Sequence, residues 1–124
     1  MRAFLTHRTL YLSAIALALA TAAFFADTKV FVVTGGSMYP TYQDGQRVLV
    51  ERFFWHLTGL RAGDVVVFDD PRGRASLDIK RVSDTPAERG TYYLLGDNAR
   101  NSTDSREWGS VPGSYILGRV IMKL

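Results

Sequence analysis

A serine and a lysine in this chain have the residue types and the setting for nucleophilic catalysis without a histidine. Ser37 lies in the segment 36–41 (GSMYPT), and Lys80 lies in the segment 78–82 (DIKRV). A serine hydroxyl is a poor nucleophile until a neighbouring base removes its proton. A lysine amine can be that base once burial or nearby positive charge favours its neutral form. We therefore expect Ser37 and Lys80 to form a catalytic pair.

The residues around Ser37 favour a stiff, exposed turn. Gly35 and Gly36 allow the chain to approach sharply without a Cβ clash, while Pro40 fixes its own φ and biases Tyr39 toward extended geometry. Such a turn leaves backbone N–H groups free to face a carbonyl oxygen, as an oxyanion hole requires. Taken alone, the segment is more typical of a serine in an ordinary Gly/Pro turn, and it is the other segments that favour catalysis.

Lys80 lies in a stretch that alternates like a β-strand. Asp78, Lys80 and Val82 share one face of that strand, and Ile79 and Arg81 share the other. If Lys80 points inward among apolar groups, loss of water favours its neutral form. Only three of the fifteen basic residues are lysines, and arginine cannot give up its proton in a protein. The alternative is a solvated lysine on a strand surface.

A third polar group follows near the C-terminal end. The turn 96–98 (GDN) precedes Ser102, Asp104 and Arg106. Short polar residues in a glycine-bounded loop form local turns, and an Asp/Arg pair can lock such a loop with two hydrogen bonds. The alternative for Asp104 and Arg106 is a surface ion pair worth under about 1 kcal/mol.

Other catalytic classes have little support. The chain has no cysteine and two histidines, of which His7 precedes the hydrophobic segment described next and His56 lies in an aromatic stretch without a partner signature. A Ser-His-Asp triad, a disulfide and a zinc site are therefore disfavoured. The net charge is +3 and the arginines are scattered without interleaved aromatics, which argues against nucleic-acid binding.

The N-terminal segment predicts a membrane anchor. No charged residue lies from Thr9 to Ala26, and as a helix this run spans roughly 27 Å, close to the hydrocarbon thickness of a bilayer. Basic residues before it and Asp27 after it place residues 1–8 in the cytoplasm and residues 27–124 outside. A cleavable signal peptide is the alternative, because Ala20-Thr21-Ala22 has the small-x-small pattern of a cleavage site.

Beyond residue 27 the pattern is that of a single β domain, 27–124, with no convincing soluble helix. We expect short strands at Lys29–Thr34, Arg47–Phe54, Asp64–Phe68, Leu77–Ser83, Thr91–Leu95 and Tyr115–Met122. Frequent Gly, Pro and Asp turns between them favour a small antiparallel sandwich or partly open barrel. The aromatic segment 53–57 (FFWHL) predicts either a loop at the membrane interface or the end of a core strand.

Four segments, in this order, resemble the type I signal peptidases, the membrane-bound serine proteases that remove secretory signal peptides. They are residues 37–41, 63–68, 80–81 and 96–106. The resemblance implies that Ser37 is the nucleophile and Lys80 the base, and that Ser102 hydrogen-bonds and orients the amine of Lys80. It implies further supporting roles for three residues of the last segment. Asp104 and Arg106 would hold their loop against the strand that carries the nucleophile, and Asp97, with its neighbour Asn98, would shape the turn.

Two features depart from that family's pattern. Many bacterial members carry a serine or threonine as an oxyanion donor at the position of Gly35, so the hole would rest on backbone N–H groups here. The stretch from Arg81 to Gly96 is short, so the large inserted cap domain of some bacterial members is missing.

The resemblance also implies the substrate. It would be an extended signal peptide that adds to a strand edge, with small residues at the first and third positions before the cut. We expect Met38, Tyr39 and Pro40, next to the nucleophile, to line the substrate pocket, with no cofactor or metal. The partners would be signal peptides of exported preproteins and the lipid bilayer of the cell membrane.

Three alternatives remain open. One is a specialised peptidase of the same fold that processes pilin or similar precursors. Another is a relative of the self-cleaving SOS repressors, which is disfavoured by the membrane segment and by the lack of a helical DNA-binding portion. The third is a membrane-tethered β module that binds extended peptides without cleaving them.

Overall fold

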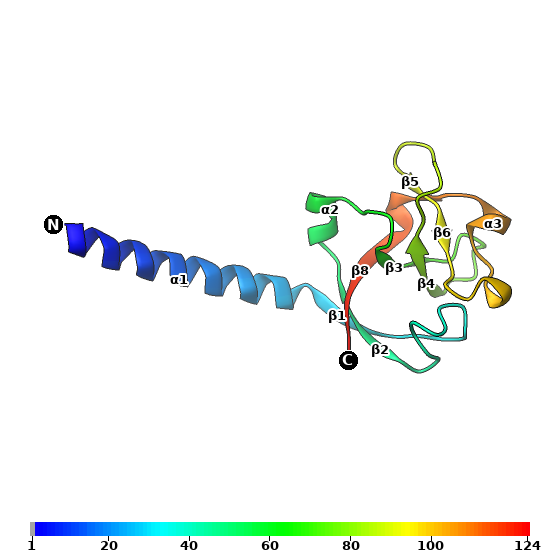
Figure 1. Ribbon diagram of the computed structural model, residues 1–124, viewed down its shortest axis with the longest axis horizontal. Helices are drawn as coiled ribbons and strands as arrows, with labels where there is room; N and C mark the ends of the chain where they lie inside the picture. The colour runs from blue at the N-terminus through cyan, green and yellow to red at the C-terminus, as the bar shows by residue number, and fades with distance from the viewer. Residues whose placement is uncertain (1) are drawn as a thin grey trace.

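The computed structural model describes residues 2–124, in which one long helix precedes a β domain (Figure 1). Helix α1 runs from Arg2 to Ala26, and its stretch Thr6–Ala26 has a mean hydropathy of 1.9 with none of its apolar window buried in the protein. A helix that is apolar on all sides and unburied by protein is suited to a lipid environment. The predicted apolar helix is confirmed, with an earlier start than the charge pattern indicated.

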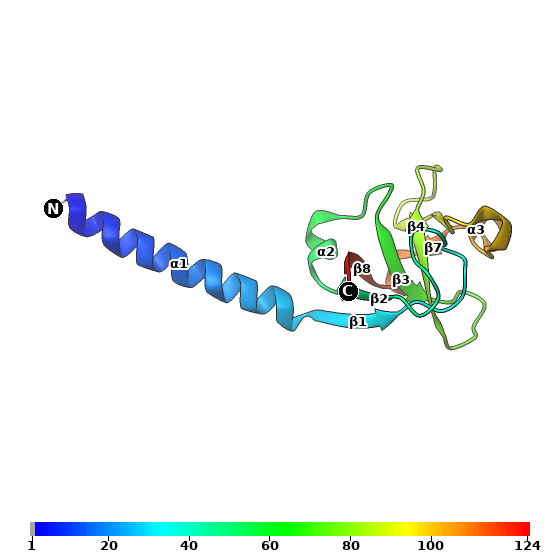
Figure 2. The same cartoon turned by 60° about the horizontal axis from the view of Figure 1, so that its bottom comes forward.

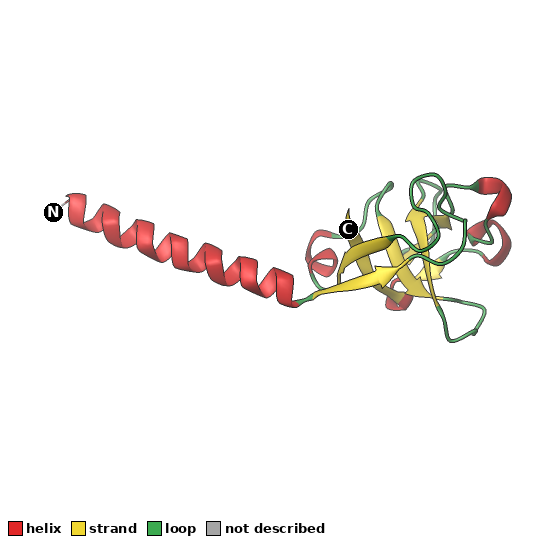
Figure 3. Ribbon diagram, turned by 90° about the horizontal axis from the view of Figure 1, so that it is seen from below, coloured by secondary structure: helices red, strands yellow, loops and turns green. Residues whose placement is uncertain are grey.

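The β domain is built on one antiparallel sheet of six strands in the order β1-β2-β8-β3-β4-β6 (Figures 1 and 3). The strands are β1 Thr28–Val32, β2 Arg47–Glu51, β3 Val65–Asp69, β4 Leu77–Val82, β6 Leu94–Leu95 and β8 Ile116–Lys123. A second pair joins β5 (Thr91–Tyr92) to β7 (Val111–Pro112). The prediction of a mainly β, antiparallel domain is confirmed, and the sheet does not close into a barrel.

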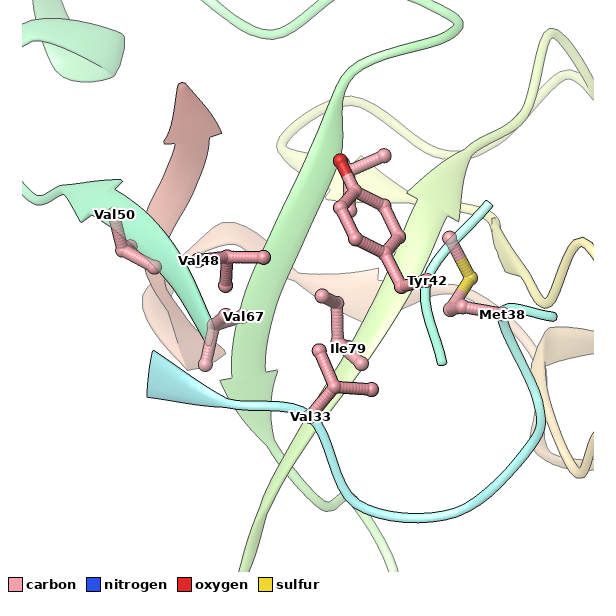
Figure 4. Close-up of a cluster of buried hydrophobic side chains, with 8 residues drawn as sticks. Val33, Met38, Tyr42, Val48, Val50, Val67 and Ile79 are labelled. Atoms are coloured by element: carbon pink, nitrogen blue, oxygen red, sulfur yellow. The ribbon is translucent and has the colours of Figure 1, made fainter. Parts of the chain in front are cut away.

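Two apolar clusters lie on opposite faces of this sheet. Strand β3 serves both, because Val65 and Val67 point into the first cluster while Val66 and Phe68 point into the second. Figure 4 shows the first cluster, in which Val33 and Met38 from the chain after β1 meet Ile79 of β4. The continuous apolar run of β3 follows from this burial on both sides.

The aromatic segment forms a short helix, α2 (Phe54–Thr58), so the strand predicted for Arg47–Phe54 ends at Glu51. The reason is a local cap: the carboxylate of Glu51 accepts hydrogen bonds from the backbone N–H of Phe54 at 2.7 Å and of Trp55 at 3.3 Å. Trp55 is buried in the second cluster, whereas Phe53 and Leu57 are exposed. The segment 53–57 thus has one buried residue, one half-buried residue (Phe54) and three exposed residues, because His56 is also exposed.

Three further short helices correct the expectation of no soluble helix. Helix α3 spans Ser105–Trp108, and the 3₁₀ turns η1 and η2 span Ala99–Asn101 and Gly113–Tyr115. Helix α3 begins after Asp104, whose side chain accepts a hydrogen bond from the backbone N–H of Arg106. The predicted strand at Thr91–Leu95 is interrupted at Tyr93, and β7 was not predicted.

Candidate active site

Ser37 and Lys80, which are 43 positions apart in sequence, meet beside strand β4. The amine Nζ of Lys80 lies 2.9 Å from Oγ of Ser37 and donates a hydrogen bond to it. The side chain of Lys80, in β4, is only 2% exposed, and Ser37 lies half-buried in the bend that follows β1. The two residues singled out by type are therefore within direct bonding distance.

The nucleophile turn is anchored on both sides of Ser37. Gly35 adopts a φ of 82°, which a residue with a Cβ rarely reaches, and its N–H donates to Asp44 Oδ1 at 2.8 Å. On the other side, Met38 is fully buried in the first apolar cluster, and its carbonyl accepts from the N–H of Tyr42. Because the residues before and after it are fixed, Ser37 has a defined direction.

The loop from residue 96 to 101 packs directly against this turn. The carbonyl of Ser37 accepts from the backbone N–H of Asn98 at 2.9 Å, and the carbonyl of Gly36 accepts from Asn98 Nδ2 at 3.0 Å. A Cβ on Gly96 would collide with the side chain of Ser102 and lie 2.7 Å from the carbonyl oxygen of Ser37. Only glycine fits at position 96 while the nucleophile turn stays in place.

Asp97 links the lysine strand to the nucleophile segment. Its carboxylate accepts from Arg81 Nε and Nη2, both at 2.8 Å, and from Thr41 Oγ1 at 2.6 Å. The hydrogen bonds from the Arg81 guanidinium, ahead of that from Thr41, lower the pKa of Asp97. The carboxylate therefore does more than shape the expected turn, because it joins β4 to the segment that carries Ser37.

Asp104 organises the last loop from a fully buried position. Its carboxylate accepts from Arg106 Nε at 2.8 Å, from the backbone N–H of Gly96 at 2.9 Å and from Ser102 Oγ at 2.7 Å. Burial by itself raises the pKa of Asp104, but these hydrogen bonds outweigh it and hold the pKa at about 2. The expected Asp104–Arg106 pair is present and fixes the loop beside the nucleophile turn.

Ser102 differs from its expected role. Its hydroxyl donates to Asp104 Oδ2, and no hydrogen bond joins Ser102 to Lys80 within the part of the chain that the structure describes. The amine of Lys80 donates instead to Ser37, Asp78 and the carbonyl of Ile79, so its donors are already used. In this structure Ser102 holds the loop and does not hold the amine.

Asp78 is the residue that sequence reasoning missed. Both of its carboxylate oxygens lie 2.9 Å from Nζ of Lys80, which also donates to the carbonyl of Ile79 at 3.1 Å. The available signal was the alternation along the strand, which puts Asp78 and Lys80 on one face of β4. The resemblance assigned no role to this position, so the carboxylate went unremarked.

A cleft of about 270 Å³ opens beside Ser37 and Lys80. Its walls are mostly polar and consist of Thr34, Gly35, Gly36, Ser37, Arg72, Asp78, Lys80, Asn101 and Thr103. The expected pocket residues Met38, Tyr39 and Pro40 are not among them, because Met38 turns into the core and Tyr39 projects to solvent. The cleft is thus shaped by the turn after β1, the loop before β4, β4 itself and the loop after β6, which are segments that no local pattern joins.

The protein family follows from sequence comparison. The chain matches the family model described as signal peptidase, peptidase S26, over residues 6–89 and 85–124. It belongs to this family. The match makes the chain a serine-type peptidase of the signal peptidase class, with preprotein signal peptides as the class of substrate. Together with the apolar helix α1, it identifies a membrane protein.

Similar proteins fall into two groups. The mitochondrial inner membrane protease subunit 1 of Mus musculus is 34% identical over 113 residues, covering 77% of this chain and 68% of the relative. Its Homo sapiens counterpart is 32% identical with the same coverage. A signal peptidase I of Leptolyngbya laminosa is 28% identical over 158 residues, covering 94% of this chain and 76% of the relative.

Proposed function

We propose that this protein is a membrane-anchored serine endopeptidase that removes signal peptides with Ser37 as nucleophile and Lys80 as general base. The observation that carries the proposal is the 2.9 Å separation of Ser37 Oγ and Lys80 Nζ, with the lysine buried. Family membership supplies the reaction class, and the cleft beside the pair supplies room for a peptide.

The proposed reaction has two stages. Neutral Lys80 takes the proton of Ser37 as its oxygen attacks the scissile carbonyl, and then passes that proton to the leaving amine. The acyl group stays on Ser37 as an ester. Lys80, neutral again, takes a proton from a water molecule that attacks the ester, and the acid product leaves as the proton returns to Ser37.

Backbone groups are suited to stabilise the tetrahedral intermediate. Within residues 2–124, the N–H of Ser37 has no acceptor in the protein. With Gly35 where many bacterial relatives carry a hydroxyl, we assign the oxyanion contact to this N–H. The turn at Gly35 and the buried Met38 hold the backbone on either side of this N–H.

Asp78 adds a step before chemistry. Its carboxylate forms an ion pair with the amine of Lys80 at 2.9 Å, so the amine has to leave this carboxylate before it can accept the proton of Ser37. Asp78 also lines the cleft, so a bound peptide would meet this ion pair directly. We propose that substrate binding and release of the lysine are coupled at this carboxylate.

The proposed topology follows from the charges around α1. The basic residues before the apolar run place residues 1–8 in the cytoplasm, 9–26 across the membrane and 27–124 on the extracytoplasmic side. The substrate would be the extended signal peptide of an exported preprotein, lying along the wall formed by residues 34–36.

The direct test is cleavage of a preprotein by purified variants in lipid. We expect Ser37→Ala to abolish cleavage, because the nucleophile is lost. We expect Lys80→Met to lower the rate of cleavage by at least about 100-fold, because the general base is lost. Lys123→Met, at an exposed lysine, is the matched control and should cleave normally. Full activity in either active-site variant would contradict the assignment.

A specialised precursor-processing peptidase is the second candidate. It is favoured by the cleft itself, where Arg72 and Asp78 place charged groups beside the nucleophile in a region expected to accept small apolar residues. Cleavage of a panel of exported precursors separates the two, since a general signal peptidase accepts most of the panel and a specialised enzyme accepts few.

A further inference from the structure

The loop between β3 and β4 is built around one buried carboxylate. Asp70 is only 8% exposed, and it accepts a hydrogen bond from the backbone N–H of Arg72 at 2.8 Å. The side chain of Arg72 adds a bidentate contact to the same carboxylate, through Nε at 2.8 Å and Nη2 at 2.7 Å. The loop is closed by a bond from the N–H of Asp70 to the carbonyl of Ser76 at 2.9 Å. The guanidinium of Arg72 is therefore held in one orientation.

This guanidinium borders the active-site cleft. Arg72 lines the cleft together with Ser37 and Lys80, whereas Asp70 is not part of its wall. Figure 2 shows β1 ending beside the paired strands β3 and β4, which places the turn that carries Ser37 close to these strands. The side chain of Arg72 is 32% exposed, and that of Asp70 is 3% exposed. The carboxylate thus lies behind the guanidinium, which faces the space where a peptide would bind.

Arg72 has donors that no group of the protein uses. Within residues 2–124, its side-chain hydrogen bonds all go to Asp70, and none of them involves Nη1. A guanidinium carries five N–H donors, so both N–H groups of Nη1 are available to a ligand. Lys80, the other cation of the cleft wall, already donates to both oxygens of Asp78. Among the described residues that line the cleft, Arg72 is thus the cation with donors to spare.

We propose that Arg72 determines specificity by binding a carboxylate side chain, Asp or Glu, of the substrate close to the scissile bond. This inference rests on the proposed function and names the class of peptide that the enzyme prefers. A guanidinium and a carboxylate form charge-assisted hydrogen bonds, and the planar fork of arginine suits that contact better than a lysine amine does. Because Asp70 already orients Arg72, little side-chain freedom is lost when the substrate binds.

The size of the cleft limits how far from the cut this carboxylate can lie. A volume of about 270 Å³ is about 6–7 Å across if it is equally wide in all directions, which is about two residues of an extended peptide. Since Arg72 and Ser37 line the same space, the carboxylate belongs to one of the two residues before the cut or the two after it. The first residue before the cut is expected to be small, which leaves three positions.

Cleavage of matched peptides by the full chain in detergent tests this preference. Every peptide keeps alanine at the first and third positions before the cut and carries Glu, Gln or Lys at one of the three remaining positions. At one of these positions we expect kcat/KM for the Glu peptide to exceed that for the Gln peptide at least about fivefold, because a charge-assisted pair is stronger than a neutral one. Asp70 offsets part of the charge of Arg72, which keeps the expected factor moderate.

Two variants separate recognition from a structural role. Arg72→Met should bring the ratio of the Glu to the Gln rate close to unity, and Arg72→Glu should turn the preference toward the Lys peptide. Each ratio is measured on one enzyme preparation, so the fraction of folded enzyme cancels. Arg74→Met, at an exposed arginine of the same loop outside the cleft wall, is the matched control and should keep the wild-type ratio. A structural role alone would lower all rates together and leave the ratio unchanged.

A wild-type protein that prefers Glu at none of the three positions would overturn the proposal, and so would a preference that persists in Arg72→Met. If the wild-type protein cleaves neither these peptides nor a preprotein, the proposed function fails, and binding alone decides the role of Arg72. Fluorescence anisotropy of the labelled peptides then measures their affinity for the full chain. Tighter binding of a Glu peptide that is lost in Arg72→Met supports the proposal, and equal affinity for the Glu and Gln peptides overturns it.

Discussion

The amine of Lys80 has three kinds of acceptor around it: the hydroxyl of Ser37, the carboxylate of Asp78 and the carbonyl of Ile79. A buried ammonium is stable only when such partners satisfy its protons. The same contacts hold the amine in one place beside Ser37. At the scale of single residues, the proposed chemistry therefore requires the amine to exchange its contact with Asp78 for the proton of Ser37.

Replacing Asp78 by Asn should free the amine of Lys80 from its ion pair. We expect kcat/KM for peptide cleavage to rise at least about threefold, because the amine no longer has to leave a charged partner before it accepts the proton of Ser37. The measurement is the rate of peptide cleavage, with Asp69→Asn, an exposed neighbour in β3, as control. An unchanged or lower kcat/KM in Asp78→Asn would remove the coupling role.

The buried carboxylate of Asp104 should contribute to the free energy of unfolding, because it accepts hydrogen bonds from the loop around it. Asp104→Ala leaves the N–H of Gly96 and the hydroxyl of Ser102 without their acceptor, which is expected to cost about 1–3 kcal/mol of unfolding free energy. Urea denaturation measures the loss. Asp84→Ala, at an exposed site, should change stability by no more than about 0.5 kcal/mol. A loss for Asp104→Ala equal to that of the control would refute the role.

The pH dependence of stability follows from the same carboxylate. The pKa of Asp104 falls from an ordinary 3.8 to about 2 on folding. A folded pKa below the unfolded one gives stability that is fully present above pH 3.8 and lost as pH falls through about 2. Asp97, whose pKa is lowered chiefly by Arg81, acts in the same direction.

Thermal unfolding between pH 5 and pH 2 provides the measurement. We expect the melting temperature to fall over this range and to fall less in Asp104→Asn, which has no proton to take up. A melting temperature that falls equally in both proteins would show that other groups govern acid unfolding.

At the scale of elements, the site depends on two loops packed against each other. The turn after β1 carries Ser37, and the loop after β6 supports it through Asn98 and Asp97. Strand β4 contributes Lys80 from a third direction. The two loops lie so close together that there is no room for a side chain at Gly96.

Gly96→Ala should therefore displace the nucleophile turn. We expect both a loss of stability and a strong loss of peptide cleavage, because the new Cβ meets Ser102 and the backbone of Ser37. Gly45→Ala is the control: it introduces backbone strain at a φ of 82° but meets no atom within 4 Å, so it should lower stability and leave activity intact. Equal activity in the two variants would contradict this account.

At the scale of the whole molecule, the apolar helix α1 leads directly into the β domain. In the proposed topology, this anchor limits the catalytic domain to a thin layer above the lipid. Affinity for a membrane-inserted substrate then depends on geometry as well as on the cleft, because tethering raises the local concentration of the two partners.

The proposed topology is testable in intact bacterial cells that express the full chain. A membrane-impermeant maleimide should label Glu88→Cys from outside, whereas His7→Cys should react only after lysis. Labelling of His7→Cys in intact cells would reverse the assigned orientation, and the absence of natural cysteines keeps the background low.

The sequence by itself determined the apolar helix, most of the strands and the choice of Ser37 and Lys80 as candidate catalytic residues, whereas their contact is a result of the tertiary structure. The helix, the strands and that choice depend on residue type and on local periodicity, which a chain displays without folding. Tertiary structure decided what each polar group bonds to: Asp78 holds Lys80, Ser102 turns to Asp104, and Asp97 joins Arg81 to Thr41. Such choices depend on which acceptors lie within about 3 Å after distant segments pack together, and local spacing carries no information on that distance.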